Sequence, residues 1–96
     1  MTILLILILN QILKSTMRVT VKYFGEIAEI MNKNEEVKSV EKSPEAFSKL
    51  KKQFFSCSSL LNTMEIKIAH NNTIVEQNVE LKEGDVLSFL PPFAGG

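Results

Sequence analysis

The spacing of apolar and polar residues predicts five strands. Residues 18–24 and 64–69 alternate apolar and polar side chains and are rich in β-branched and aromatic residues, as half-buried strands are. Residues 35–40 form a more polar strand, which suits the edge of a sheet. Residues 73–75 form a short fourth strand. Residues 86–90 are almost entirely apolar, which favours a central strand with a parallel neighbour.

Helical spacing appears in two places. Gly25 ends the first strand, and residues 26–31 then carry apolar side chains at intervals that predict one or two helical turns. Residues 43–45 predict the start of the main helix, with a serine N-cap, a proline at the first helical position and a glutamate in the first turn. The side chains expected to face the core are Phe47, Leu50 and Phe54.

The order of these elements predicts an α+β roll. Two strands form a hairpin, one main helix follows, and three further strands complete a mixed sheet of four to five strands with the helix packed across one face. The long connection between the first and last strands allows them to pair in parallel. We therefore expect these two strands to lie side by side at the centre of the sheet.

The aliphatic run at residues 3–9 stands apart from this pattern. No Lys or Arg precedes it and no small-residue cleavage site follows it, as a secretory signal would require. It is also shorter than the roughly 20 apolar residues that span a bilayer. We expect residues 1–16 to be a dispensable leader, residues 17–90 to form the domain and residues 91–96 to form a flexible tail. A packed extra helix or strand, or a role in self-association, is the alternative for the leader.

Composition excludes several classes of function. The 96 residues suit one domain, and 11 basic side chains balance 11 acidic ones, so the chain has no excess positive charge to neutralise nucleic acid phosphates. A single cysteine, Cys57, rules out an internal disulfide and indicates a reducing cytoplasm. One histidine and one cysteine cannot build a zinc site of the usual kind. We expect no metal and no cofactor bound by this chain, and no membrane partner.

The last six residues are the strongest candidate for chemistry. Glycine loses the most backbone entropy on folding and has no side chain to pack, so a Gly-Gly end suits a carboxylate that enters another protein's narrow site. Two prolines before it hold the base of the tail extended. They could equally do no more than end the last strand. The residues of this tail are Pro91, Pro92, Phe93, Ala94, Gly95 and Gly96.

Three segments together carry a resemblance to a known family. They are residues 21–27, residues 69–75 and residues 81–96, the last combining a Gly-Asp turn, an apolar strand, Pro-Pro and a terminal Gly-Gly. In these segments the chain resembles the ubiquitin-like β-grasp sulfur carriers, and specifically the small subunits of molybdopterin synthase. The resemblance covers residues 17–96 and implies a β-grasp fold.

The resemblance also implies a reaction and its partners. An ATP-dependent activating enzyme would adenylate the carboxylate of Gly96, and sulfur would replace the adenylate to give a thiocarboxylate. The large subunit of molybdopterin synthase would then use that sulfur on cyclic pyranopterin monophosphate, and two transfers would build the dithiolene of molybdopterin. The family implies a heterotetramer with two small subunits on a dimer of large ones. The catalytic pocket would lie in the large subunit.

Individual residues take roles from the same resemblance. The tail residues from Pro91 to Gly95 would thread the carboxylate into the partner, with Gly95 keeping the approach unhindered. Phe93 would anchor the tail against a partner surface or fold back on its own domain. The positions that match apolar contacts with the large subunit are Phe24, Ile74 and Leu90. His70 falls in an expected turn, where a solvent-exposed histidine is the expected arrangement.

Three other functions stay open on the residues alone. The sulfur carrier of the thiamine pathway has the same fold and the same thiocarboxylate chemistry, but its chains usually lack Pro-Pro before the tail. A ubiquitin-like modifier would join Gly96 to lysines of other proteins and would leave stable isopeptide conjugates. A plain interaction module with a fortuitous Gly-Gly end would lose nothing when its tail is deleted.

Overall fold

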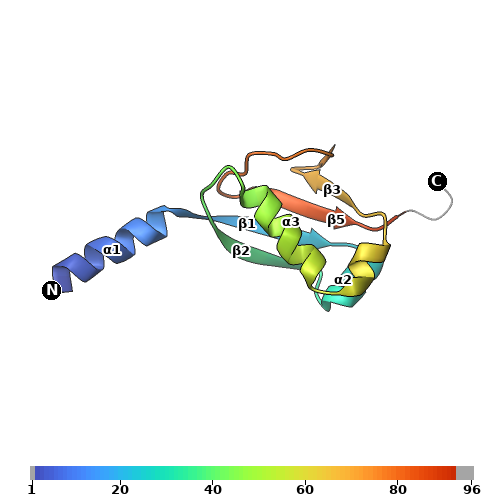
Figure 1. The fold of residues 1–96 in the computed structure, drawn as a ribbon, viewed down its shortest axis with the longest axis horizontal. Coiled ribbons are helices and arrows are strands. Elements are labelled where there is room, and N and C mark those ends of the chain that lie inside the picture. The colour runs from blue at the N-terminus through green and yellow to red at the C-terminus, as the bar shows by residue number, and fades with distance from the viewer. Residues whose placement is uncertain (1, 93–96) are drawn as a thin grey trace.

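The computed structural model describes residues 2–92, which form a small domain with one projecting helix (Figure 1). Four elements make up the first half: α1 (Thr2–Lys14), β1 (Thr16–Tyr23), α2 (Gly25–Met31) and β2 (Glu35–Glu41). The second half contains α3 (Ala46–Ser56), the 3-10 helix η1 (Ser59–Thr63), β3 (Lys67–His70), β4 (Thr73–Val75) and β5 (Val86–Leu90).

The five strands form one mixed sheet in the order β2-β1-β5-β3-β4. The first and last strands of the chain pair in parallel at its centre, with Val21 opposite Leu87 and Tyr23 opposite Phe89. The pairs β1–β2, β3–β5 and β3–β4 are antiparallel. The expected α+β roll, the parallel central pair and the edge position of β2 are all confirmed.

The core lies between this sheet and α3, which crosses one face of it (Figure 1). Its centre is an aromatic stack in which the rings of Phe54 and Phe89 have centroids 3.8 Å apart and Tyr23 lies about 6 Å from both. The predicted core stripe of α3 is confirmed, since Phe47, Leu50 and Phe54 are buried. Alternation along β1 and β5 sends their other side chains to the opposite face, which we call the open face.

Several boundaries differ from the sequence prediction; β1, for example, spans Thr16–Tyr23 rather than residues 18–24. The helix α3 begins at Ala46, because residues 43–45 instead form a turn in which the Ser43 hydroxyl accepts a hydrogen bond from the Glu45 amide. The third strand is shorter than expected at its start and longer at its end, so that His70 is its last residue. The 3-10 helix η1, in which the Ser58 side chain accepts a hydrogen bond from the Leu60 amide, lies in a segment for which the sequence predicted no helix or strand.

The N-terminal run forms the helix α1, which projects from the start of β1 as a separate arm (Figure 1). Its seven aliphatic residues, 3–9, keep between 46% and 75% of their surface exposed. The helix that we considered as an alternative therefore forms, but these side chains do not pack on the domain. No helix within residues 2–92 has the length and apolarity needed to cross a bilayer. That residues 1–16 are dispensable stays a prediction.

Candidate functional site: the tail exit

The tail leaves the domain at the end opposite α1. Because β1 and β5 run in parallel, the end of β5 lies beside the end of β1, far from the point where α1 enters (Figure 1). Pro91 and Pro92 follow directly, and neither has an N–H to continue the ladder. Pro91 is half-buried and Pro92 is exposed. We call Phe24, Gly25, Leu90, Pro91 and Pro92 the tail exit.

Gly25 and Pro91 meet closely at the tail exit. Gly25 has a φ of +54°, a conformation that residues with a side chain rarely adopt. A Cβ atom at this position would lie 3.0 Å from Cγ of Pro91, which is too close for an unstrained contact. Two separate features of the structure therefore favour glycine here. From the sequence alone, Gly25 was expected only to end a strand.

Three residues predicted to face a partner lie on the open face near this exit. Leu90 shares that face with Ser88, which pairs with Ala69, and Ala69 in turn pairs with Ile74. Phe24 continues β1 in extended conformation beyond the buried Tyr23, so it turns to the same face. Phe24 is 43% exposed and Ile74 is 48% exposed, whereas Leu90 is half-buried.

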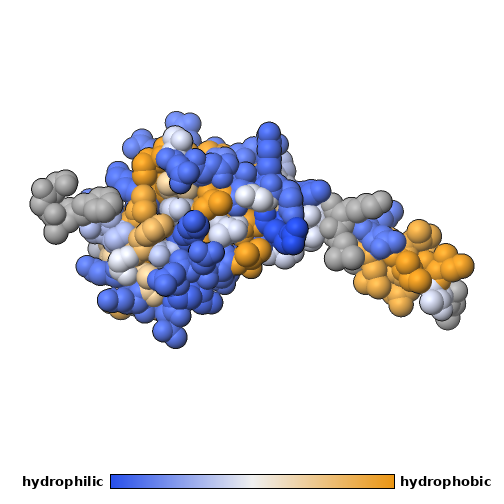
Figure 2. Space-filling view, turned by 180° about the vertical axis from the view of Figure 1, so that it is seen from behind, coloured by the Kyte–Doolittle hydropathy of each residue, from blue (hydrophilic) through white to orange (hydrophobic). Residues whose placement is uncertain are grey.

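Figure 2 shows the open face from behind the sheet. Apolar side chains form a band at the end of the domain away from α1, and hydrophilic side chains surround them. Two lysines flank the predicted contact positions, since Lys67 pairs with Leu90 and Lys22 pairs with Ser88. The open face thus presents a small apolar surface beside the base of the tail, bordered by Lys67 and by Lys22, which pairs with Glu35 on β2.

The other predictions for the tail concern residues beyond Pro92. Phe93, Ala94, Gly95 and Gly96 lie outside the described residues. The structure therefore places the base of the predicted thread and the predicted partner positions, and it brings these two sets together. The roles that we assigned to all of these residues stay predictions.

Cys57 and His70 carry the side chains of this chain that are most typical of catalysis, and each one makes a hydrogen bond to a neighbouring residue. Cys57 is exposed at the end of α3, and its thiol donates a hydrogen bond to the carbonyl of Gln53 across 3.3 Å. The ring nitrogen Nε2 of His70 lies 2.7 Å from Oδ2 of Asp85. Our expectation of a solvent-exposed turn histidine was wrong, because His70 ends a strand and keeps only 21% of its side chain exposed.

Asp85 joins the turn after β3 to the start of β5. Its carboxylate accepts hydrogen bonds from the Asn71 side chain at 3.0 Å and from the Lys82 amide at 2.9 Å, in addition to the contact with His70. Burial alone would raise the pKa of this carboxyl. The hydrogen bonds from Asn71, His70 and Lys82 outweigh burial and hold the pKa of Asp85 below its ordinary value of 3.8.

This network predicts a loss of stability in acid. A carboxyl whose pKa is lower in the folded state contributes stability above its unfolded pKa, and that contribution is lost as the pH falls through the folded pKa. We expect the Asp85 contribution to be complete above about pH 5, to begin to fall near pH 4, and to be lost only as the pH passes below the folded pKa. Asp85→Asn should cost about 2 kcal/mol at neutral pH and flatten the fall in stability over this range.

Urea unfolding of both proteins between neutral pH and about pH 3, followed by circular dichroism, checks this prediction. The free energy difference between Asp85→Asn and the unaltered chain should shrink as the pH falls. A difference that stays constant at every pH would show that Asp85 does not act through its ionised form.

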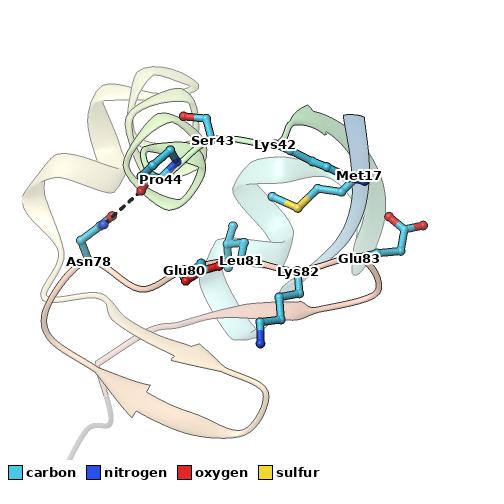
Figure 3. A pocket seen from close by; sticks show the side chains of 9 residues that line it. All are labelled: Met17, Lys42, Ser43, Pro44, Asn78, Glu80, Leu81, Lys82 and Glu83. Carbon is cyan, nitrogen blue, oxygen red and sulfur yellow. Dashed lines mark hydrogen bonds between the residues drawn. The ribbon is translucent and has the colours of Figure 1, made fainter. Parts of the chain in front are cut away.

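A cavity lies at the opposite end of the domain from the tail exit. It is an open pocket of about 580 Å³ between the turn after β2 and the segment before β5, with Met17 and Leu81 in its apolar wall (Figure 3). Across it, the Asn78 side chain donates to the carbonyl of Pro44 over 3.2 Å. No histidine or cysteine lines this pocket, and the described residues 2–92 contain no cluster of three potential metal ligands. We therefore take the tail exit as the candidate site.

The chain is similar to several known proteins. The family model described as the ThiS family matches residues 21–96. The complex of subunits 1 and 2 of molybdopterin-converting factor from Helicobacter pylori contains a chain that is 27% identical, with a TM-score of 0.60 over 83% of this chain and 100% of that one. A protein of Pyrococcus furiosus, provisionally described as molybdopterin converting factor subunit 1, is 25% identical, with a TM-score of 0.64 over 80% of this chain and 99% of that one.

One further likeness concerns the fold alone. The small archaeal modifier protein 1 of Haloferax volcanii superposes with a TM-score of 0.66 at 15% identity, over 80% of this chain and 99% of that one. A comparison with curated proteins gave no match. Together with the sheet topology, these likenesses confirm the predicted β-grasp fold.

Proposed function

The chain belongs to the ThiS family of ubiquitin-like sulfur carriers, and on that premise we propose that it is the sulfur-donating small subunit of a molybdopterin synthase. The observation that carries the proposal is the position of the tail base. The last strand lies at the centre of the sheet and ends in Pro91-Pro92 beside an apolar surface on the open face. A partner bound on that surface would receive the tail directly.

The proposed chemistry takes place at the carboxylate of Gly96. A carboxylate oxygen attacks the α-phosphorus of ATP in the activating enzyme, which gives an acyl-adenylate and releases pyrophosphate. A sulfide donor then attacks the carbonyl carbon, AMP leaves, and the thiocarboxylate forms. On transfer, the sulfur displaces an oxygen substituent from a carbon of cyclic pyranopterin monophosphate, so that a C–S bond replaces a C–O bond and the oxygen group leaves. Water then hydrolyses the bond between that sulfur and the Gly96 carbonyl carbon and restores the carboxylate. This chain consumes no cofactor, since the ATP belongs to the activating enzyme.

The domain contributes binding and positioning to this reaction. The rigid sheet fixes where the tail begins, and the two prolines reduce the entropy that the tail loses on entering a narrow site. Acid–base groups would come from the large subunit, because the tail has no titratable side chain. In this arrangement, binding of the large subunit to the open face holds the sulfur atom close to the substrate and so raises its effective concentration there. We also propose the cytoplasm as its location, on the single exposed cysteine.

Partner binding gives the first test. Ile74→Lys places a further cation beside the lysine border of the open face, and we expect it to weaken binding to the large subunit by about tenfold or more. The unfolding midpoint should change little, because Ile74 is 48% exposed. Isothermal titration calorimetry with purified large subunit measures the effect.

Val37→Lys is the matched control. Val37 is also apolar, β-branched and on the open face, where it pairs with Thr20, and it is 62% exposed. It lies on the edge strand β2, whereas Ile74 lies on β4 at the opposite edge of the sheet. Equal losses of affinity in both variants, or none in Ile74→Lys, would contradict a partner surface centred beside the tail exit.

A consumption assay separates this function from the thiamine pathway, which the family also leaves open. The chain carrying a thiocarboxylate is mixed either with molybdopterin synthase large subunit and cyclic pyranopterin monophosphate or with the thiazole-forming synthase of the thiamine pathway. Mass spectrometry should show loss of the thiocarboxylate only with the first partner. Consumption by the second partner alone would replace our proposal, and stable isopeptide conjugates in cells would indicate a protein modifier.

A further inference from the structure

We propose that Gly25 is a positioning residue for the sulfur-carrying tail. Because Gly25 has no side chain, Pro91 packs directly against the end of β1. This packing contact between Gly25 and Pro91, which we call the seat, fixes the direction in which the chain leaves the sheet. The role of Gly25 in sulfur transfer rests on the proposed function. The contact between Gly25 and Pro91 can be observed without any assay of sulfur transfer.

The turn at Gly25 is the fixed side of this contact. The carbonyl of Phe24 accepts hydrogen bonds from the amides of Ile27 and Ala28, which ties the end of β1 to the first turn of α2. Ile27 is fully buried and holds α2 on the core. A side chain added at Gly25 therefore cannot move away from Pro91 without disturbing the first turn of α2.

Pro91 is the side that would yield. Its ring is part of the backbone, with φ fixed near −65°, so the ring cannot turn aside as a free side chain would. It also has no N–H through which the sheet could hold it. A Cβ at 3.0 Å from its Cγ therefore shifts the backbone at the point where the tail begins.

The chain offers two variants that separate this contact from backbone strain. Gly84 also has a positive φ, of +83°, but a Cβ there would meet nothing within 4 Å. Gly84→Ala therefore carries the backbone cost without a contact. Asparagine tolerates positive φ, and this chain already places Asn32 at +58°. Gly25→Asn therefore adds the contact with Pro91 at a small backbone cost.

The test compares these variants for sulfur transfer to the large subunit. Gly25→Ala and Gly25→Asn should lower kcat/KM by about 10- to 100-fold, the loss typical of a misplaced reacting group, whereas Gly84→Ala should keep it. Gly25→Ala and Gly84→Ala should both lower the unfolding midpoint, since both carry the cost of a positive φ, and Gly25→Ala also carries the contact with Pro91. Adding Pro91→Ala, which removes Cγ, should return Gly25→Ala to the activity of Pro91→Ala alone.

A structural measurement keeps the inference independent of the proposed function. Nuclear Overhauser contacts between the Pro91 ring protons and the backbone at Phe24 and Gly25 should be present in the unaltered chain and in Gly84→Ala. They should weaken in Gly25→Asn. Retention of these contacts in Gly25→Asn, or equal transfer by Gly25→Ala and Gly84→Ala, would overturn the positioning role. Failure of the unaltered chain to accept sulfur, with the contacts behaving as expected, would contradict the proposed function and leave the seat established.

Discussion

Deleting Gly96 should abolish thiocarboxylate formation and all sulfur transfer while leaving the fold intact. The proposed reaction places the reacting carbon on Gly96 itself, so the shortened chain presents its carboxylate one residue too early for both partner sites. The core is complete without the tail, since its buried side chains run from Met17 to Phe89 within the described residues. Mass spectrometry after charging, and circular dichroism during heating, measure the two effects.

Two control proteins sharpen this prediction. Adding one alanine after Gly96 keeps every natural residue and should abolish charging equally, because the carboxylate then stands in the wrong place. Removing residues 1–14 shortens the opposite end of the domain and should leave charging and transfer unchanged. Full sulfur transfer by the Gly96 deletion would contradict the proposed role of the C-terminal carboxylate.

Phe89→Ala should destabilise the domain by about 3–5 kcal/mol, the range measured for large aromatic truncations in cores. The side chain is 1% exposed on the central strand β5. Its ring stacks on that of Phe54 with centroids 3.8 Å apart, and the ring of Tyr23 lies 6.1 Å away. Truncation leaves a cavity between the sheet and α3 that neither Tyr23 nor Phe54 can fill alone. A domain of this size has only about 5–15 kcal/mol of stability to lose.

Urea unfolding followed by circular dichroism measures this loss, and Ile74→Ala serves as the control. Ile74 also lies in the sheet, but on the short edge strand β4 and with 48% of its surface exposed. Its truncation should cost less than about 1 kcal/mol. Equal costs for the two variants would contradict the central position of β5.

The sequence predicted the sheet well because its strands carry their own signals. Alternation in β1 and the apolar run of β5 identify a central pair, and the long connection between them along the chain allows the two strands to pair in parallel. The polar composition of β2 marked it as an edge. The alternation of apolar and polar residues along a strand shows which of its faces is buried, and this pattern can be read from a single sequence.

Local competition between hydrogen bonds explains the errors. Ser43 could cap a helix, but its hydroxyl instead closes a turn on the amide of Glu45, and α3 starts at Ala46. The polar sequence around His70 predicted a turn, yet Asp85 binds the ring and the strand continues through it. In both cases a hydrogen bond, from Glu45 to Ser43 or between His70 and Asp85, determines the local structure, and the spacing of apolar residues gives no sign of it.

The candidate site was predictable only in part, for a related reason. Phe24, Ile74 and Leu90 were named from a resemblance, and the strand register explains why they share one face. Gly25 escaped notice because its partner, Pro91, comes from the far end of the chain. The glycine after an aromatic strand end is visible in sequence, but the proline that it accommodates becomes apparent only once β1 and β5 are paired in parallel.

The central claim is that the terminal carboxylate of this chain accepts sulfur. The most direct test is the intact mass of the full chain after incubation with ATP, an activating enzyme and bisulfide. Our account predicts a mass gain equal to one exchange of oxygen for sulfur, located by fragmentation at Gly96 and dependent on ATP. An unchanged mass with every activating enzyme that charges other members of the family, or sulfur located elsewhere in the chain, would contradict it.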